Sequence, residues 1–163
     1  MRAIIDILQA NSNITPERIA TMTGIDVEQV RAQIAAWEQA GVIRRYKAVI
    51  DQDRLRAVTD VEVITALIDV SVSPERGVGF DDVAARIALF PEVRSVYLVS
   101  GAQDLRCVIT GGSMHEIADF VAQKLATISR VTATATHFVL KMYKDDGELY
   151  VKPAEDHRLQ VTP

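Results

Sequence analysis

A short connection between two helical segments is the feature that most constrains this chain. The connection, Thr23–Ile25, contains Gly24, and glycine adopts the positive φ that a sharp turn needs. The segment before it opens with Thr15 ahead of Pro16, and the one after it opens with Asp26, which are residues typical of helix N-termini. Two helices joined by so short a turn predict a helix-turn-helix.

The flanking segments complete a small domain. An apolar repeat at helical spacing precedes the pair and ends at the polar break of residues 11–13. After Gly41, the run Val42–Asp51 alternates and is rich in β-branched residues, which predicts a strand or wing. We therefore expect a winged helix-turn-helix domain over residues 1–53, with Val30, Ile34 and Trp37 facing its core.

The rest of the chain predicts a mixed α+β domain. A polar connector is expected over residues 54–60, and strand–helix–strand then occurs twice, as in a ferredoxin-like βαββαβ fold. The expected segments are strand Val61–Val72, helix Phe80–Phe90, strands Val93–Ser100 and Asp104–Thr110, a helix ending near Thr127, and strand Val131–Met142. This domain would span residues 61–145, followed by a hairpin and polar tail over 146–163.

One face of such a sheet would lack a covering helix. We expect apolar side chains there, such as Val61, Val63 and Leu67, and an exposed apolar face of that size is unusual on a monomer. The pattern therefore predicts a homodimer.

Charge is unevenly distributed along the chain. The net charge is −4, but residues 1–50 hold six basic and five acidic side chains, against 12 and 17 in residues 51–163. Because phosphate binding relies on lysine and arginine, any contact with nucleic acid belongs to the first domain.

Other classes of protein and site find little support. The N-terminus is not typical of a signal peptide and no apolar run approaches a membrane span, so a cytoplasmic protein without membrane contact is expected. The single cysteine, Cys107, suits a buried position, and His115, His137 and His157 show no metal-ligand spacing. No phosphate loop, nucleophile elbow or carboxylate pair is present, so we expect neither cofactor nor metal, and no enzymatic activity.

Several motifs resemble those of the Lrp/AsnC, or feast/famine, transcriptional regulators. The family's winged helix-turn-helix continues into a Glu-x-x-Gly-Val-Ile-x-x-Tyr run, which here is Glu38 to Tyr46. Residues 79–105 and 136–147 are similar to one branch of its ligand-sensing domain. The resemblance implies a regulator that binds double-stranded DNA, forms dimers that often build tetramers or octamers, and responds to a small molecule such as an amino acid.

The resemblance also implies an effector turn with the pattern Gly-x-Tyr/Phe-Asp. Here Gly101 and Asp104 keep the glycine and the acid, but the aromatic is replaced. Asp104 could neutralise an ammonium, and backbone N–H groups of the turn could bind a carboxylate. The candidate effector residues are Ser100, Gly101, Ala102, Gln103 and Asp104, with Thr134 and Thr136 on the last strand. A plain hairpin turn would use the same glycine and aspartate.

Base contacts are expected at the N-terminal part of the second helix of the motif. The candidates there are Val27, Glu28, Gln29 and Arg31, and the wing adds Arg44, Arg45 and Lys47. Gln29 could pair with adenine, Glu28 with cytosine, and Arg31 with guanine or a phosphate. A solvated helix face and a solubilising strand edge are the alternatives. Arg31 is the only basic residue of its helix, so phosphate attraction there would be weak.

Two other functions compete with DNA-binding regulation. The shortage of basic residues would suit a ligand-binding oligomer that has lost DNA contact. Some haem-pathway decarboxylases resemble the same two-domain fold, but the sequence does not assemble their basic and histidine-containing pocket. Sequence-specific DNA binding tuned by a metabolite is the function that these motifs favour.

Overall fold

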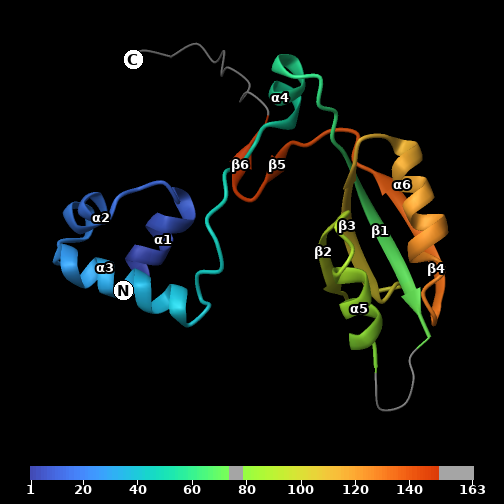
Figure 1. Ribbon diagram of the computed structural model, residues 1–163, viewed down its shortest axis with the longest axis horizontal. Helices are drawn as coiled ribbons and strands as arrows, with labels where there is room; N and C mark the ends of the chain where they lie inside the picture. Colours follow the sequence, from blue (N-terminus) through green and yellow to red (C-terminus); the bar gives the residue numbers. More distant parts are fainter. Residues whose placement is uncertain (74–78, 151–163) are drawn as a thin grey trace, which may run out of the picture. The chain divides into compact units, whose positions relative to one another are not determined.

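The computed structural model describes residues 1–73 and 79–150, which fall into two compact units, Met1–Ile50 and Asp51–Pro163 (Figure 1). The polar end of the predicted tail, with His157, lies outside the described residues. Each unit has a hydrophobic core of its own.

Three helices make up the first unit: α1 (Arg2–Ala10), α2 (Pro16–Thr23) and α3 (Val27–Gln39). The predicted caps are confirmed, because the Thr15 side chain accepts from the Arg18 N–H and Gly24 ends α2 with φ +70°. Asp26 accepts from the first backbone N–H groups of α3. The core consists of Ile4, Leu8, Ile19 and Val30, with Ile34 and Trp37 packed against it.

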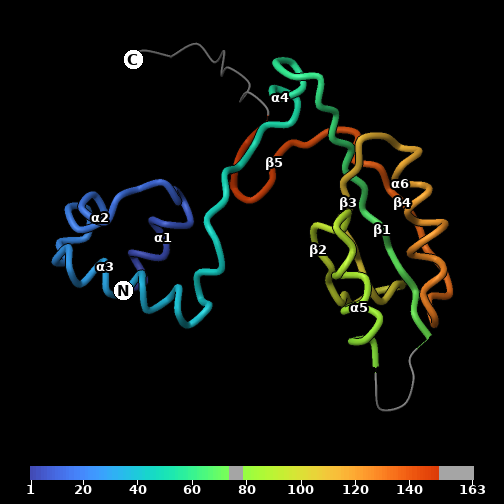
Figure 2. Tube along the Cα trace, in the orientation of Figure 1, coloured from blue at the N-terminus to red at the C-terminus, as the bar shows by residue number. Residues whose placement is uncertain are grey.

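The predicted strand over Val42–Asp51 is wrong for the single chain. Residues 44–51 form an extended trace without helix or strand (Figure 2). A strand needs a neighbour to accept and donate its backbone hydrogen bonds. The described residues of the first unit are otherwise helices and turns, so this segment has none there.

The second unit opens on a helix that the sequence did not predict. Part of the expected connector, residues 54–60, belongs to α4 (Gln52–Val58). Asp51 starts this helix by accepting from the Arg54 N–H at 3.1 Å. Because α4 has no buried residue, it lacks the apolar face by which sequence reasoning finds helices.

A four-stranded antiparallel sheet forms the centre of this unit, in the order β2-β3-β1-β4. This is the ferredoxin-like arrangement predicted from the repeated strand–helix–strand order. The strands are β1 (Ile64–Val72), β2 (Val93–Leu98), β3 (Leu105–Gly111) and β4 (Val131–Phe138). The helices are α5 (Asp81–Ala88) and α6 (Met114–Phe120), which continues as the π-helical turn η1 (Val121–Leu125).

Both helices pack on the same face of the sheet (Figure 1). Alternate residues of the central strands face them, including Ile68 on β1 and Cys107 on β3, which lie opposite each other. Cys107 is fully buried, and burial raises the pKa of its thiol to about 11. The prediction that this cysteine is a core residue is therefore confirmed.

The opposite face of the sheet, here called the open face, is more polar than expected. Leu67 lies on it opposite Val108, but the next pair on the same face is Asp69 and Arg106. Val61 and Val63 precede β1 and are not part of the sheet. The expectation of apolar side chains on this face is confirmed for Leu67 but wrong for Val61 and Val63, and the strands carry an ion pair beside Leu67 and Val108.

The chain then closes a small hairpin, β5 (Lys144–Asp145) and β6 (Glu148–Leu149). Asp146 and Gly147 connect them with φ of 47° and 91°, as a type I′ turn requires. The hairpin predicted at this Asp-Gly pair is confirmed.

Candidate DNA-binding surface and effector pocket

The exposed surface of α3 carries most of the residues predicted to contact bases. Glu28, Gln29 and Arg31 are exposed, Val27 is half-buried, and Val30 between them is fully buried. The local sequence explains this arrangement, because Asp26 starts the helix and Val30 fixes which side of it faces the core. Polar side chains of the first turns are thereby presented to solvent, as a helix that reads a major groove requires.

Arg31 does not stand alone on this surface. Its Nη2 donates to Glu17 Oε1 on α2, and its Nε lies 3.7 Å from Glu28 Oε1 on α3. The pKa of Glu17 lies below its ordinary value because the carboxylate accepts hydrogen bonds from the backbone and from Thr15, and because Arg31 is close. Sequence reasoning missed the role of Glu17, which depends on the packing of α2 against α3.

The extended segment after α3 presents Arg44, Arg45 and Lys47 as exposed residues. Two contacts tie this segment to the helical unit, one to α3 and one to the loop between α1 and α2. Tyr46 donates its hydroxyl to Glu38 Oε1 at 2.8 Å, and Ser12 donates to the Lys47 carbonyl at 3.3 Å. Basic side chains are therefore held near the helices without the strand that the sequence predicted.

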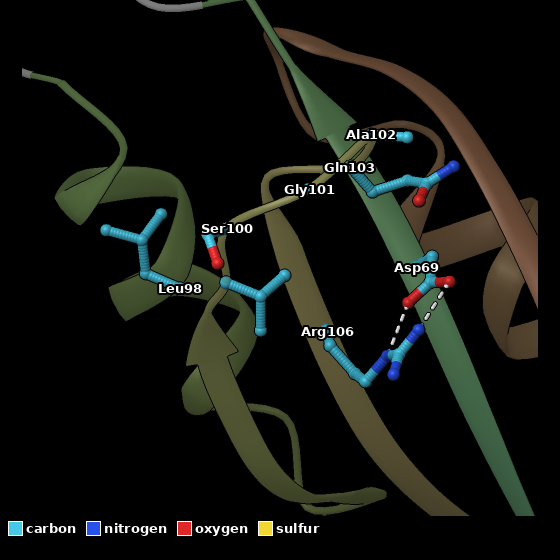
Figure 3. Close-up of a pocket in the computed structure, with 8 residues that line it drawn as sticks. Asp69, Leu98, Ser100, Gly101, Ala102, Gln103 and Arg106 are labelled. Carbon is cyan, nitrogen blue, oxygen red and sulfur yellow. Dashed lines mark hydrogen bonds and ion pairs between the residues drawn. The ribbon is translucent and has the colours of Figure 1, made fainter.

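A pocket of about 610 Å³ lies in the second unit, where the loop between β2 and β3 meets the open face (Figure 3). This volume is within the range of about 300–1,000 Å³ found for small-molecule sites. Its lining consists of Asp69, Leu98, Val99, Ser100, Gly101, Ala102, Gln103 and Arg106. The pocket therefore combines a glycine-containing loop with two charged side chains.

Asp69 and Arg106 form the charged part of the pocket (Figure 3). Arg106 donates from Nε and Nη2 to the two carboxylate oxygens of Asp69, at 2.7 and 2.9 Å. His137 on β4 lies 3.6 Å from the same carboxylate. The hydrogen bond from Arg106 is the main reason that the pKa of Asp69 lies below its ordinary value. Asp69 is only 5% exposed, so the pair fixes Arg106 firmly against the sheet.

Some of the predicted effector residues gather at this pocket and others do not. Ser100 to Gln103 line it, whereas Asp104, Thr134 and Thr136 are not part of the lining. Asp104 Oδ2 instead accepts from the Val72 N–H at 2.8 Å. The two threonines lie opposite Val70 and Ile68, whose side chains belong to the buried face.

Sequence reasoning missed Asp69 and Arg106, although each leaves a faint signal. Each is a charged residue within a strand that otherwise contains apolar or small residues. The neighbouring sequence gives no reason for a charge at either position. Only the register of β1 against β3 brings the two together. Within residues 1–73 and 79–150, no group of three or more His, Cys, Asp or Glu side chains could hold a metal ion.

Comparison with known proteins identifies both units. The model of the Lrp/AsnC ligand binding domain matches residues 65–149, and that of a winged helix-turn-helix DNA-binding domain matches residues 1–44. The chain belongs to the Lrp/AsnC family. The chain is also 49% identical over 160 residues to YugG, an uncharacterized helix-turn-helix-type transcriptional regulator of Bacillus subtilis. That match covers 98% of this chain and 95% of the relative.

Solved structures share the fold. A feast or famine regulatory protein of Mycobacterium tuberculosis, complexed with L-methionine, has a TM-score of 0.72 at 24% identity and covers 90% of this chain and 94% of its own. A Neisseria meningitidis transcriptional regulator, also complexed with L-methionine, has a TM-score of 0.71 at 23% identity, with 94% of each chain covered.

The Lrp/AsnC assignment fixes the general function. The chain is a DNA-binding transcriptional regulator with a ligand-binding domain, and it is not an enzyme of the decarboxylase type considered from the sequence. No helix among the described residues is long and apolar enough to span a membrane.

Proposed function

We propose that this regulator binds a free amino acid in the pocket beside Gly101 and that the bound amino acid changes its affinity for DNA or its assembly. The observation that carries the proposal is the Asp69–Arg106 pair in the wall of that pocket. Two structural neighbours contain L-methionine, which supports an amino acid as the class of effector. Because its targets would be chromosomal promoters, the protein would act in the cytoplasm.

Arg106 is the group that would bind the effector's carboxylate. Its Nε and Nη2 are directed at Asp69, and a guanidinium has five N–H donors, so the donors of Nη1 remain for a second acceptor. Backbone N–H groups of the loop at Gly101 would add to this anion site. Ser100 and Gln103, which also line the pocket, offer oxygen atoms to the ammonium.

Asp104 does not line the pocket, as a contact with the effector's ammonium would require. Its carboxylate holds the end of β1 through the Val72 N–H, outside the pocket lining. We therefore propose Asp104 as a structural support of the loop. Thr134 and Thr136 stay candidates only for indirect effects through β4.

The test is a thermal-shift screen of the amino acids, followed by calorimetric titration of each hit. We expect Arg106→Gln to abolish the shift, because it removes the proposed carboxylate contact. Arg94→Gln is the matched control, since Arg94 is an arginine of the same sheet that donates to Thr110 away from the pocket lining. An undiminished shift with Arg106→Gln would reject the site, and no shift with any amino acid would reject the class of effector.

We also propose that the open face is a homodimer interface. Leu67 and Val108 lie opposite each other at its centre, and α5 and α6 pack on the other side of the sheet. A second copy would bury this apolar pair. Dimers of this kind could assemble further into tetramers or octamers, and a dimer would present two α3 helices to DNA, which raises affinity by linking two weak contacts.

The basic segment after α3 would supply the phosphate contacts in this scheme. Val27, Glu28 and Gln29 would read base edges, and Arg44, Arg45 and Lys47 would contact the backbone. Replacing Arg44 and Arg45 by glutamine is expected to weaken binding to all sequences alike and to make the salt dependence shallower. A change confined to one sequence would instead assign these arginines to base reading.

A further inference from the structure

Two carboxylates surround the only basic residue of α3. Arg31 bonds through Nη2 to Glu17 on α2, and its Nε lies 3.7 Å from Glu28. Both acids therefore approach the same fork of the guanidinium, the one made by Nε and Nη2. The fork made by Nη1 and the second hydrogen of Nη2 points elsewhere and remains available to another acceptor.

This arrangement matters because arginine can contact DNA in two ways. The Nη1–Nη2 fork matches the O6 and N7 acceptors of guanine, whereas a mobile arginine can equally bind any phosphate. A carboxylate on the inner fork restricts the side chain. The same negative charge repels phosphate groups, because a glutamate side chain is ionised at neutral pH.

We propose that Glu17 is a positioning residue for sequence recognition: it holds Arg31 so that its outer fork contacts a guanine edge, and it lowers affinity for phosphate. The inference rests on α3 being the helix that enters the major groove. It explains why a regulator of DNA places an acid on α2 within bonding distance of its only α3 arginine. Specificity is raised and non-specific affinity is lowered by the same pair.

The experiment compares two duplexes in fluorescence anisotropy titrations with the full chain. One is selected from a random-sequence library by the wild-type protein, and the other is a scrambled duplex of the same composition. The variants are Glu17→Gln, Arg31→Gln and the double variant. Asp6→Asn is the matched control, since Asp6 is an exposed acid of α1 and its loss changes the charge of the same unit equally.

With Glu17→Gln, we expect tighter binding to the scrambled duplex and weaker or unchanged binding to the selected one. The ratio of the two affinities should fall about tenfold, the scale of one bidentate base contact. The salt dependence on the scrambled duplex should steepen, because a released arginine gains a phosphate contact. Since Glu17 and Arg31 are 57% and 50% exposed, the variant should fold normally, which a thermal melt checks.

The control and the double variant decide between positioning and a general charge effect. Asp6→Asn should raise the affinities for both duplexes together and leave their ratio unchanged. In the Arg31→Gln background, Glu17→Gln should likewise change the two affinities no more than Asp6→Asn does. A ratio unchanged by Glu17→Gln, or an equal effect in the presence and absence of Arg31, would overturn the inference. If the wild-type protein selects no sequence from the library, the proposal that this domain recognises a DNA sequence is rejected.

Discussion

Single residues set the local geometry of both sites, and Asp69 is the clearest case. Its side chain is 7% exposed, and its carboxylate receives two hydrogen bonds from Arg106, with His137 close by. Replacing Asp69 by asparagine removes the negative charge and at least one strong hydrogen bond. Hydrogen bonds to charged groups are worth about 1.5–3 kcal/mol, and the half-exposed Arg106 reduces this, so we expect a loss of about 1–2 kcal/mol in the free energy of unfolding.

The same residue predicts a dependence on pH. Pairing lowers the pKa of Asp69 below its unfolded value of about 4. The pair therefore contributes fully to the free energy of unfolding at pH values above the unfolded pKa. The contribution is lost as the pH falls through the lowered pKa. Denaturant unfolding of the wild type between neutral and acid pH should show this loss, and Asp69→Asn should show a shallower acid limb. Identical acid limbs would mean that the pair does not stabilise the fold.

Gly24 makes the turn of the helix-turn-helix possible through its backbone alone. Its φ is +70°, and a Cβ built there would have nothing within 4 Å. Gly24→Ala should therefore cost about 1–2 kcal/mol in unfolding free energy, the cost of the left-handed conformation, with no steric clash added. Urea unfolding measures it, and a variant as stable as the wild type would contradict the positive φ.

At the scale of the element, α3 depends on its cap. Asp26 Oδ2 accepts from the N–H groups of Glu28 and Gln29 at 3.0 and 3.3 Å. Asp26→Ala is expected to lower the unfolding free energy by about 1 kcal/mol, and Asp26→Asn to restore most of it, since asparagine caps equally well. Equal losses in the two variants, compared by urea unfolding, would argue against capping as the cause.

The sequence could predict those elements that are determined by neighbouring residues, but not those that depend on contacts with distant parts of the chain. Thr15, Gly24 and Asp26 act on their own neighbours, so the helix ends were predictable from the chain alone. The strands facing α5 and α6 were predictable from alternating apolar residues. The segment after α3 has the composition of a strand, but pairing needs a second strand that composition cannot supply.

The residues of the candidate sites also differ in whether they are neighbours in the sequence or meet only in the fold. The loop from Ser100 to Gln103 is a contiguous motif, and it was found in the sequence. Asp69 and Arg106 are 37 residues apart and meet only through the register of β1 and β3. Glu17 and Arg31 likewise meet across two helices, 14 residues apart. Neither pair has a sequence signal beyond an isolated charge.

At the scale of the whole molecule, the open face should hold two copies together. Val108→Lys would place a charge at its centre, opposite Leu67, and is expected to give a monomer in sedimentation velocity. Leu89→Lys is the matched control, because Leu89 is 84% exposed at the end of α5 and faces no partner in this scheme. A wild-type sedimentation coefficient for Val108→Lys would place the interface elsewhere.

Regulation then joins two units that carry separate sites. The first unit offers few basic groups, so the proposed contact with DNA would combine base reading by α3 with the binding of more than one copy. The second unit has a pocket in which Asp69 holds Arg106, the proposed contact for the effector's carboxylate. An amino acid in that pocket would alter DNA binding by changing the assembly that presents the α3 helices.

The most direct test measures binding of the full chain to its own promoter and to a scrambled duplex, at low and at physiological salt, with and without the amino acid that gives the largest thermal shift. We predict tighter binding to the promoter at both salt concentrations and a change in that affinity when the amino acid is added. Equal binding to the two duplexes at both salt concentrations, with or without the amino acid, would contradict the account and would favour a ligand-binding oligomer that does not read DNA.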